Sequence, residues 1–243
     1  MNQRTGPPAI QLPTLEPWMQ KILQWIAGLF VVEIGLRAAG VPIDRLELYP
    51  SSDPRFALWQ PFTHLVTQGG LESFFRVAIG VLVLVFFLPA LNQALNTRQL
   101  KSSAAAIVCG AVLIPALFEM MGMIQGAQMY GWQQLLTGLF VLYGLAKPNQ
   151  SIHLFFVIPV RASLFVWGSL GLSALFFIGD QSVLTAEPIG AWCGAYAWWN
   201  VAGPGGRRRT LLRDAARIEE SLQRFDVLEG GLSEEGKPPE EWH

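Results

Sequence analysis

Long apolar runs alternate with short polar stretches along this chain. Four runs are about as long as the roughly 20 residues that a helix needs to cross a 30 Å hydrocarbon layer, and they occupy about residues 18–39, 70–91, 104–124 and 152–178. Two shorter runs, at about 132–146 and 188–202, lie between and after them. The pattern predicts an all-α membrane protein with about six transmembrane helices.

The segments outside these runs predict the domain organisation. Residues 1–17 are polar and proline-rich and are expected to form a flexible N-terminal tail, with the transmembrane domain at 18–203. A basic amphipathic helix at 204–229 and a disordered tail at 230–243 are expected to follow it. Pro and Asp/Ser punctuation in residues 40–68 rules out one continuous span, so we expect this apolar-rich loop to lie in the membrane interface.

Composition supports the membrane interpretation. Hydrophobic residues make up 51% of the chain and charged residues only 14%, with nine Trp and fifteen Phe among 243 residues, which is more apolar than a soluble domain of this length. The formal net charge of -1 gives no reason to expect a nucleic-acid partner. The three histidines have no Cys or His near them in the sequence, so neither a metal site nor a cofactor is expected.

The distribution of basic residues predicts the orientation. With six spans, most Lys and Arg fall on the side of the two termini, which the positive-inside rule assigns to the cytoplasm. Arg45 and Arg55 fall on the opposite side and weaken the asymmetry without reversing it. We therefore expect a multi-pass protein of a bacterial inner (cytoplasmic) membrane. The residues that carry this bias are Arg4, Lys21, Arg98, Lys101, Lys147, Arg161 and Arg207 to Arg209.

Acidic residues within the apolar runs are candidates for function, because a charge in a membrane helix is costly. Glu33 lies four residues before Arg37, which allows either an ion pair at the interface or a functional charge. Glu72 and Arg76 share the same spacing. Glu119 lies near the end of its run, where it could either serve a function or reach water.

Two sequence segments resemble rhomboid-like membrane proteins. The segment PNQSIHLFFVIPVRA, within residues 131–162, is similar to the join between the fourth and fifth helices of that family. The segment LWQPFTHLVTQGGLESFF is similar to the family pattern of Trp-Arg, a Thr three residues later, and His-Gly-Gly at the start of the second helix. The resemblance covers about residues 15–203 and implies a bundle of six helices.

The same resemblance implies that the protease site of the family has degenerated. The position of the catalytic serine falls on Gln133, that of the following glycine on Gln134, and that of the catalytic histidine on Glu187. A carboxamide cannot act as the hydroxyl nucleophile that an imidazole activates. The positions that help to form the oxyanion site in active members hold Gln68, Ser73 and Val77.

Glycines predict which helices approach one another closely. Gly138 matches the family glycine five residues after the serine, and Gly190 and Gly194 match glycines that follow the histidine. In rhomboid-like proteins these glycines let the fourth helix pack against the sixth. The resemblance therefore implies the same contact here, and small residues in membrane helices generally permit such packing.

Non-catalytic rhomboid-like proteins, or pseudoproteases, bind membrane clients, and the resemblance implies that this chain holds, routes or assembles a transmembrane partner. Two alternatives stay open: proteolysis by an unusual residue set, with Thr137 as the only hydroxyl before a glycine on the fourth helix, and transport through Glu33, Glu119 and Glu187. The candidate client-binding residues are Glu72, Arg76, Glu119, Gln133 and Glu187.

The C-terminal helix carries a second candidate contact surface. Five apolar residues recur at spacings of four, three, four and three, which places them in one narrow stripe of a charged helix. This stripe could contact a partner helix, the protein itself or anionic membrane lipid. Its members are Leu211, Ala215, Ile218, Leu222 and Phe225.

Overall fold

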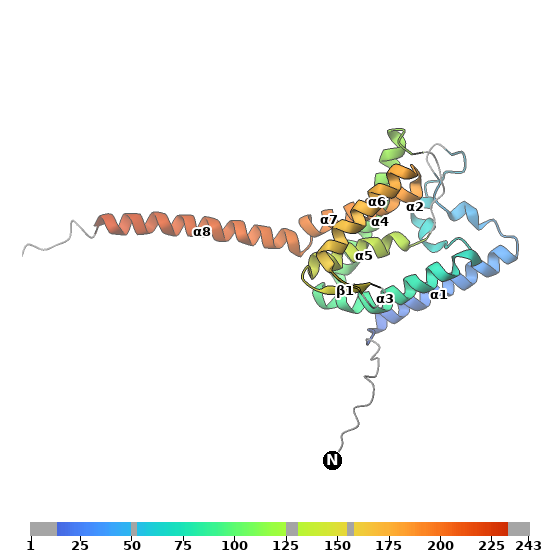
Figure 1. Cartoon of the computed structure of the whole chain (residues 1–243), viewed down its shortest axis with the longest axis horizontal. Helices are drawn as coiled ribbons and strands as arrows, with labels where there is room; N and C mark the ends of the chain where they lie inside the picture. The colour runs from blue at the N-terminus through green and yellow to red at the C-terminus, as the bar shows by residue number, and fades with distance from the viewer. Residues whose placement is uncertain (1–13, 50–52, 125–130, 155–157, 233–243) are drawn as a thin grey trace, which may run out of the picture. The chain divides into compact units, whose positions relative to one another are not determined.

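The structure is a computed structural model that describes residues 14–49, 53–124, 131–154 and 158–232. The described chain is almost entirely α-helical, with one short hairpin (Figure 1). The helices are α1 (Pro17–Ala38), η1 (Ile43–Leu46), α2 (Gln60–Thr63), η2 (His64–Val66), η3 (Leu71–Ser73), α3 (Phe74–Ala94), α4 (Thr97–Met120), α5 (Gln133–Ala146), α6 (Ala162–Gly179), α7 (Val183–Val201) and α8 (Pro204–Leu232), and the strands are β1 (Ser151–Leu154) and β2 (Ile158–Arg161).

Four helical segments are long and apolar enough to cross a membrane: Pro17–Ala38, Leu71–Ala94, Thr97–Met120 and Ala162–Gly179. They coincide with the four long apolar runs of the sequence. The helix α5 is apolar but only 14 residues long, and α7, with 19 residues, carries Glu187 and Asn200. The prediction of multiple spans is therefore confirmed for four helices, whereas six spans stay a prediction.

The outer faces of the candidate spans are apolar, the reverse of a water-soluble bundle. Trp25 and Val31 on α1 are 69% and 67% exposed, and Ile79 on α3 and Leu113 on α4 are 61% and 65% exposed. Large contiguous apolar surfaces on a protein indicate contact with a membrane or a partner. Together with the helix lengths, these faces define a multi-pass membrane protein.

The helix α5 packs against three neighbours, α3, α4 and α6. Its Leu139, Val141 and Leu142 are buried, and its ring contacts join Phe140 to Phe87 of α3. Close approach depends on glycine: a Cβ at Gly138 would overlap the side chain of Ile107 on α4. Because α5 is enclosed by other helices, its polar residues are held inside the protein.

The sequence predicted that Gly190 and Gly194 of the expected sixth helix, α7, would pack against the expected fourth helix, α5. The structure gives these glycines a different partner helix, α4. Both glycines of α7 face α4: a Cβ at Gly190 would strike the backbone of Gly110, and one at Gly194 would strike that of Ala106. Gly138, which was expected to face α7, faces α4 as well. Small residues allow close backbone approach but do not specify the partner helix, and Gly110 and Ala106 give α4 the complementary small surface.

The expected fifth helix begins ten residues later than the sequence suggested. The start of the run forms an antiparallel hairpin in which Ser151 pairs with Arg161 and Leu154 with Ile158, and α6 begins at Ala162. Pro159 cannot donate a backbone hydrogen bond within a helix, and β-branched residues around it favour strands. Continuous hydrophobicity alone does not separate a helix from a strand.

The helix α4 begins earlier than expected. Its N-cap is Asn96, whose side chain accepts from the backbone N–H of Gln99, while the Gln99 side chain accepts from the Asn96 N–H. This capping box satisfies two backbone donors at once. Arg98 and Lys101, which precede the apolar run at 104–124, therefore lie in the first turns of the helix.

The chain divides into two compact units, residues 1–198 and 199–243. The second unit contains α8, whose residues 207–222 are all exposed. Of the expected tails at 1–17 and 230–243, residues 1–13 and 233–243 lie outside the described residues, whereas Pro17 begins α1 and residues 230–232 belong to α8.

Candidate functional site

A buried carboxylate on α1 joins that helix to the loop before α3. Glu33, 4% exposed, accepts backbone hydrogen bonds from Gln68 at 2.6 Å and from Gly69 and Gly70 at 3.1 Å each. Three consecutive N–H groups can converge on one carboxylate because Gly69 and Gly70 have φ of 86° and 78°, the left-handed region that glycine adopts without strain. The positive φ angles of this turn therefore explain why glycine occupies both position 69 and position 70.

Arg37 completes this cluster and extends it to the loop after α1. Its guanidinium donates to Glu33 at 3.0 Å, to Asp44 at 2.7 Å and to Glu47 at 2.7 Å. The planar fork of arginine suits several carboxylates at once. Burial raises the pKa of Glu47 above its ordinary value, although the bond from Arg37 acts in the opposite direction. Of the two readings of the Glu33–Arg37 spacing, the structure contains the ion pair.

The described parts of the loop at 40–68, residues 40–49 and 53–68, are held together by polar side chains. Gln60, 1% exposed, accepts from the Tyr49 N–H at 3.2 Å and donates to the backbone carbonyls of Arg45 and Arg55 at 3.3 and 2.8 Å. Thr63 donates to the Leu46 carbonyl at 2.8 Å. Because the buried amide of Gln60 makes its hydrogen bonds within the loop, it stabilises the loop and is not free to bind a ligand.

His64 connects this loop to α5. Its Nδ1 lies 3.0 Å from the Gln60 carbonyl oxygen, and its Nε2 lies 3.1 Å from Nε2 of Gln134. A carbonyl can only accept, so Nδ1 carries the proton and Nε2 accepts from the amide, which is the neutral imidazole. Burial lowers the pKa of His64, outweighing the backbone bonds that raise it. The Gly131 N–H also donates to the His64 carbonyl at 2.8 Å.

Residues that the rhomboid resemblance predicts for a degenerate protease site, Val77 apart, come from three distant parts of the chain: the loop before α3, the start of α5, and α7. Arg76 donates to the Gln68 carbonyl at 2.9 Å and to Ser73 Oγ at 2.6 Å. Gln133 Nε2 lies 3.5 Å from Gln68 Oε1, at the outer limit of a hydrogen bond. Glu187, 8% exposed, lies on α7. We call Gln68, Ser73, Arg76, Gln133, Gln134 and Glu187 the polar cluster.

Three buried polar atoms at the start of α5 have no hydrogen-bond partner: Trp132 Nε1, Gln133 Oε1 and Gln134 Oε1. An unsatisfied buried donor or acceptor costs about 1–3 kcal/mol, and the cost is higher in hydrocarbon, where water cannot substitute. Gln133 is half-buried and Arg76 is exposed, so this end of the polar cluster can be reached from outside. The arrangement can therefore bind a polar group.

The chemistry of the polar cluster differs from that of a serine protease. The hydroxyl of Ser73 accepts a hydrogen bond from the guanidinium of Arg76. A guanidinium has no acceptor atom, so it cannot take the proton of the hydroxyl as a general base would. The imidazole of His64 uses both nitrogens for the Gln60 carbonyl and the Gln134 amide. Within the described ranges, no three His, Cys, Asp or Glu side chains are grouped as metal ligands would be.

Other candidates lie elsewhere. Glu72 is exposed on η3, Glu119 is half-buried near the end of α4, and Val77 is buried in α3. In the C-terminal stripe, Leu211, Ile218 and Leu222 are 69%, 59% and 58% exposed. Ala215 is also exposed, whereas the side chain of Phe225 lies outside the described part.

Sequence reasoning missed two features of this region. It noted Glu33 and Gly69-Gly70 separately, but nothing in the spacing of 35 residues indicated that one binds the other. It also treated His64 as an isolated histidine, although the residue bonds to Gln134. Comparisons of the chain with known protein families, with characterised proteins and with solved structures find no match.

Proposed function

We propose that this protein is a catalytically inactive, rhomboid-like membrane protein, a pseudoprotease that binds and holds a transmembrane client through its polar cluster. The observation that carries the proposal is the group of unpartnered buried atoms of Trp132, Gln133 and Gln134. A client helix that carries a polar residue would supply the missing hydrogen bonds, as polar side chains do between membrane helices.

The position of the polar cluster also favours this proposal. Its members come from the loop before α3, from the start of α5 and from α7, which are the places that the rhomboid resemblance implies for the degenerate site. In the proposed topology, α5 and α7 cross the bacterial inner membrane together with the four long helices, and both termini are cytoplasmic. The short length of α5 suits a helix enclosed by protein, where neighbours shield its ends.

The test is photo-crosslinking followed by affinity purification from native membranes. Wild-type protein is expected to capture one membrane protein reproducibly, and Gln133→Leu combined with Gln134→Leu is expected to lose it. The matched control is Gln150→Leu, which removes an exposed glutamine in the turn after α5. Equal capture by all three proteins would contradict client binding at the polar cluster.

Deletion of the chain after Gly203 tests the second candidate surface separately. The stripe of α8 is exposed where its side chains are described. A partner helix with apolar residues at the a and d positions of a heptad repeat could therefore pack against it as in a coiled coil. Loss of the partner in this deletion, with capture retained in the glutamine variants, would move the binding site from the polar cluster to α8.

A further inference from the structure

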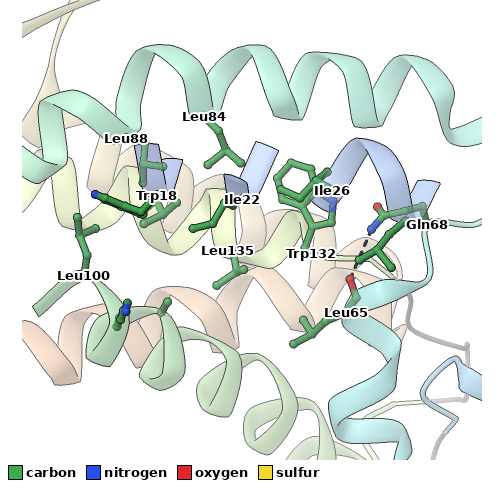
Figure 2. Close-up of a pocket in the computed structure, with 14 residues that line it drawn as sticks. Trp18, Ile22, Ile26, Leu65, Gln68, Leu84, Leu88, Leu100, Trp132 and Leu135 are labelled. Carbon is green, nitrogen blue, oxygen red and sulfur yellow. Dashed lines mark hydrogen bonds between the residues drawn. The ribbon is translucent and has the colours of Figure 1, made fainter. Parts of the chain in front are cut away.

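An apolar space of the described bundle lies between α1, α3, α4 and α5. It has a volume of about 310 Å³, at the small end of ligand sites in proteins. Figure 2 shows its long shape, with Trp18, Leu88 and Leu100 at one end and Gln68, Leu65 and Trp132 at the other. We call this space the apolar slot.

The two ends of the apolar slot differ in polarity. Lys101, the neighbour of Leu100 on α4, also lines the slot and is exposed, so its ammonium can reach the membrane surface while its stem covers apolar wall. Trp18 lies at the same end, and tryptophan favours the level of lipid headgroups. The walls between the ends are Ile22, Ile26, Leu29, Leu84, Ala104, Leu135 and Leu139.

The dimensions of the apolar slot match one lipid tail. Between the lining residues Trp18 and Leu29, α1 rises about 16 Å at 1.5 Å per residue. One leaflet of a bilayer contributes about 15 Å of hydrocarbon, half of the ~30 Å core. A tail whose headgroup sits at Lys101 would therefore reach the end at Trp132.

The lining of the slot is apolar and aromatic apart from Gln68 and Lys101. An acyl chain needs no hydrogen bonds from the leucines that line the walls, so this lining suits a hydrocarbon tail. The slot is therefore distinct in its ligand from the polar cluster, although Gln68 borders both.

We propose that the apolar slot holds one acyl chain of an anionic phospholipid, with the headgroup at Lys101 and the tail between α1 and the rest of the bundle. The positive charge of Lys101 selects an anionic over a zwitterionic headgroup, since one cation near a membrane surface contributes about 1 kcal/mol of attraction to anionic lipid.

The test uses full-length protein in nanodiscs that contain a phospholipid with a photoreactive group near the end of its tail. One preparation carries the probe on phosphatidylglycerol and the other on phosphatidylcholine, and mass spectrometry maps the labelled residues. Leu84, Leu88 and Leu139 are only 5%, 7% and 8% exposed, so tails that merely touch the outer surface do not reach them. Outer-face residues such as Ile79 report that background in the same sample.

We expect the phosphatidylglycerol probe to label the buried leucines above the outer-face background in wild-type protein. Ala104→Phe fills the slot and should reduce this labelling to background, whereas Ala105→Phe, on the exposed side of α4, should leave it intact. A melting temperature for each variant shows that it is folded. Background labelling of the leucines in wild type, or undiminished labelling in folded Ala104→Phe, would overturn the proposal.

A separate variant tests the contact between Lys101 and the lipid headgroup. Lys101→Gln should lower labelling by phosphatidylglycerol about fivefold, the factor that ~1 kcal/mol represents, and leave labelling by phosphatidylcholine unchanged. Arg98→Gln removes an exposed cation on the same helix that does not line the slot, and it should change neither. Equal labelling by both lipids in wild type would overturn the anionic headgroup. No client is present, so the outcome is independent of the proposed client binding.

Discussion

Two groups of buried polar residues in the described bundle differ in how their hydrogen bonds are met, although Glu47 Oε2, beside Arg37, is also buried without a partner. Around Glu33, a carboxylate meets three backbone N–H groups and a guanidinium. At the start of α5, the side-chain oxygens of Gln133 and Gln134 are buried without a partner. Gln68 belongs to both groups, since its N–H binds Glu33 and its side chain faces Gln133.

This difference distinguishes a group of residues that stabilises the fold from a group that can bind a ligand or partner. A polar group that is fully satisfied inside a protein specifies the packing of its own segments. One that is left unsatisfied lowers stability and is retained where a ligand or partner completes it. The Glu33 cluster therefore holds α1 and its loop in place, and the polar cluster next to it is the part that the proposed function uses.

Removing the carboxylate of Glu33 should have the largest effect on stability. Glu33→Ala leaves three N–H groups and Arg37 without their acceptor, and breaking a buried ion pair costs about 3–5 kcal/mol. The free energy of unfolding in micelles measures it. Glu72→Ala, which removes an exposed carboxylate, is the control. A loss below about 1 kcal/mol for Glu33→Ala would contradict the structural role.

Replacing Arg37 by lysine should have a smaller effect on the same cluster. Lysine keeps the charge but cannot donate to Glu33, Asp44 and Glu47 together, and hydrogen bonds to charged groups contribute about 1.5–3 kcal/mol. We expect Arg37→Lys to lower the free energy of unfolding by about 2 kcal/mol, measured as above. Arg98→Lys, at an exposed position, should change it little; equal effects would show that the fork geometry is unimportant.

The pH dependence of stability tests the connection between the loop and α5. His64 is neutral when folded and its pKa is lowered, whereas the unfolded side chain titrates near 6.5. Below pH 6.5 the unfolded state therefore binds more protons, and the free energy of unfolding should fall by up to about 1.4 kcal/mol per pH unit until the folded histidine also protonates. Above pH 6.5 this contribution is constant.

The control for this prediction is His64→Gln, which cannot titrate in this range. Melting temperatures at pH 7.5, 6.5 and 5.5, chosen to bracket the unfolded histidine pKa of about 6.5, should fall for wild type and remain closer together for the variant. Parallel profiles for the two proteins would mean that another group carries the pH dependence.

Replacing Gln133 should have the smallest effect on stability. Gln133→Leu removes an unpartnered oxygen at little cost in volume, so we expect a change within about 1 kcal/mol of zero, or a gain. Gln134→Leu instead takes the donor from His64 and should cost about 1 kcal/mol. If Gln133→Leu destabilised the protein as strongly as Glu33→Ala, the contrast between the two groups of residues would fail.

Much of the architecture could be predicted from the sequence. The four long apolar runs became the four candidate spans because hydrophobic length is itself what a bilayer selects. The hairpin at residues 151–161 could not be predicted, because an apolar run around Pro159 carries no periodicity that distinguishes strand from helix. The partner of Gly190 and Gly194 was also beyond prediction, since a small surface fits any other small surface.

The sequence by itself determined that this chain has several helices long and apolar enough to cross a membrane, whereas the correspondence of its polar residues with the catalytic positions of rhomboid-like proteins stays a prediction. Only the tertiary structure decided which of those polar residues are satisfied. The reason is physical: hydrophobic length is a local property of the chain, whereas a hydrogen bond between Glu33 and Gly70, 37 residues apart, exists only when the fold brings the two together.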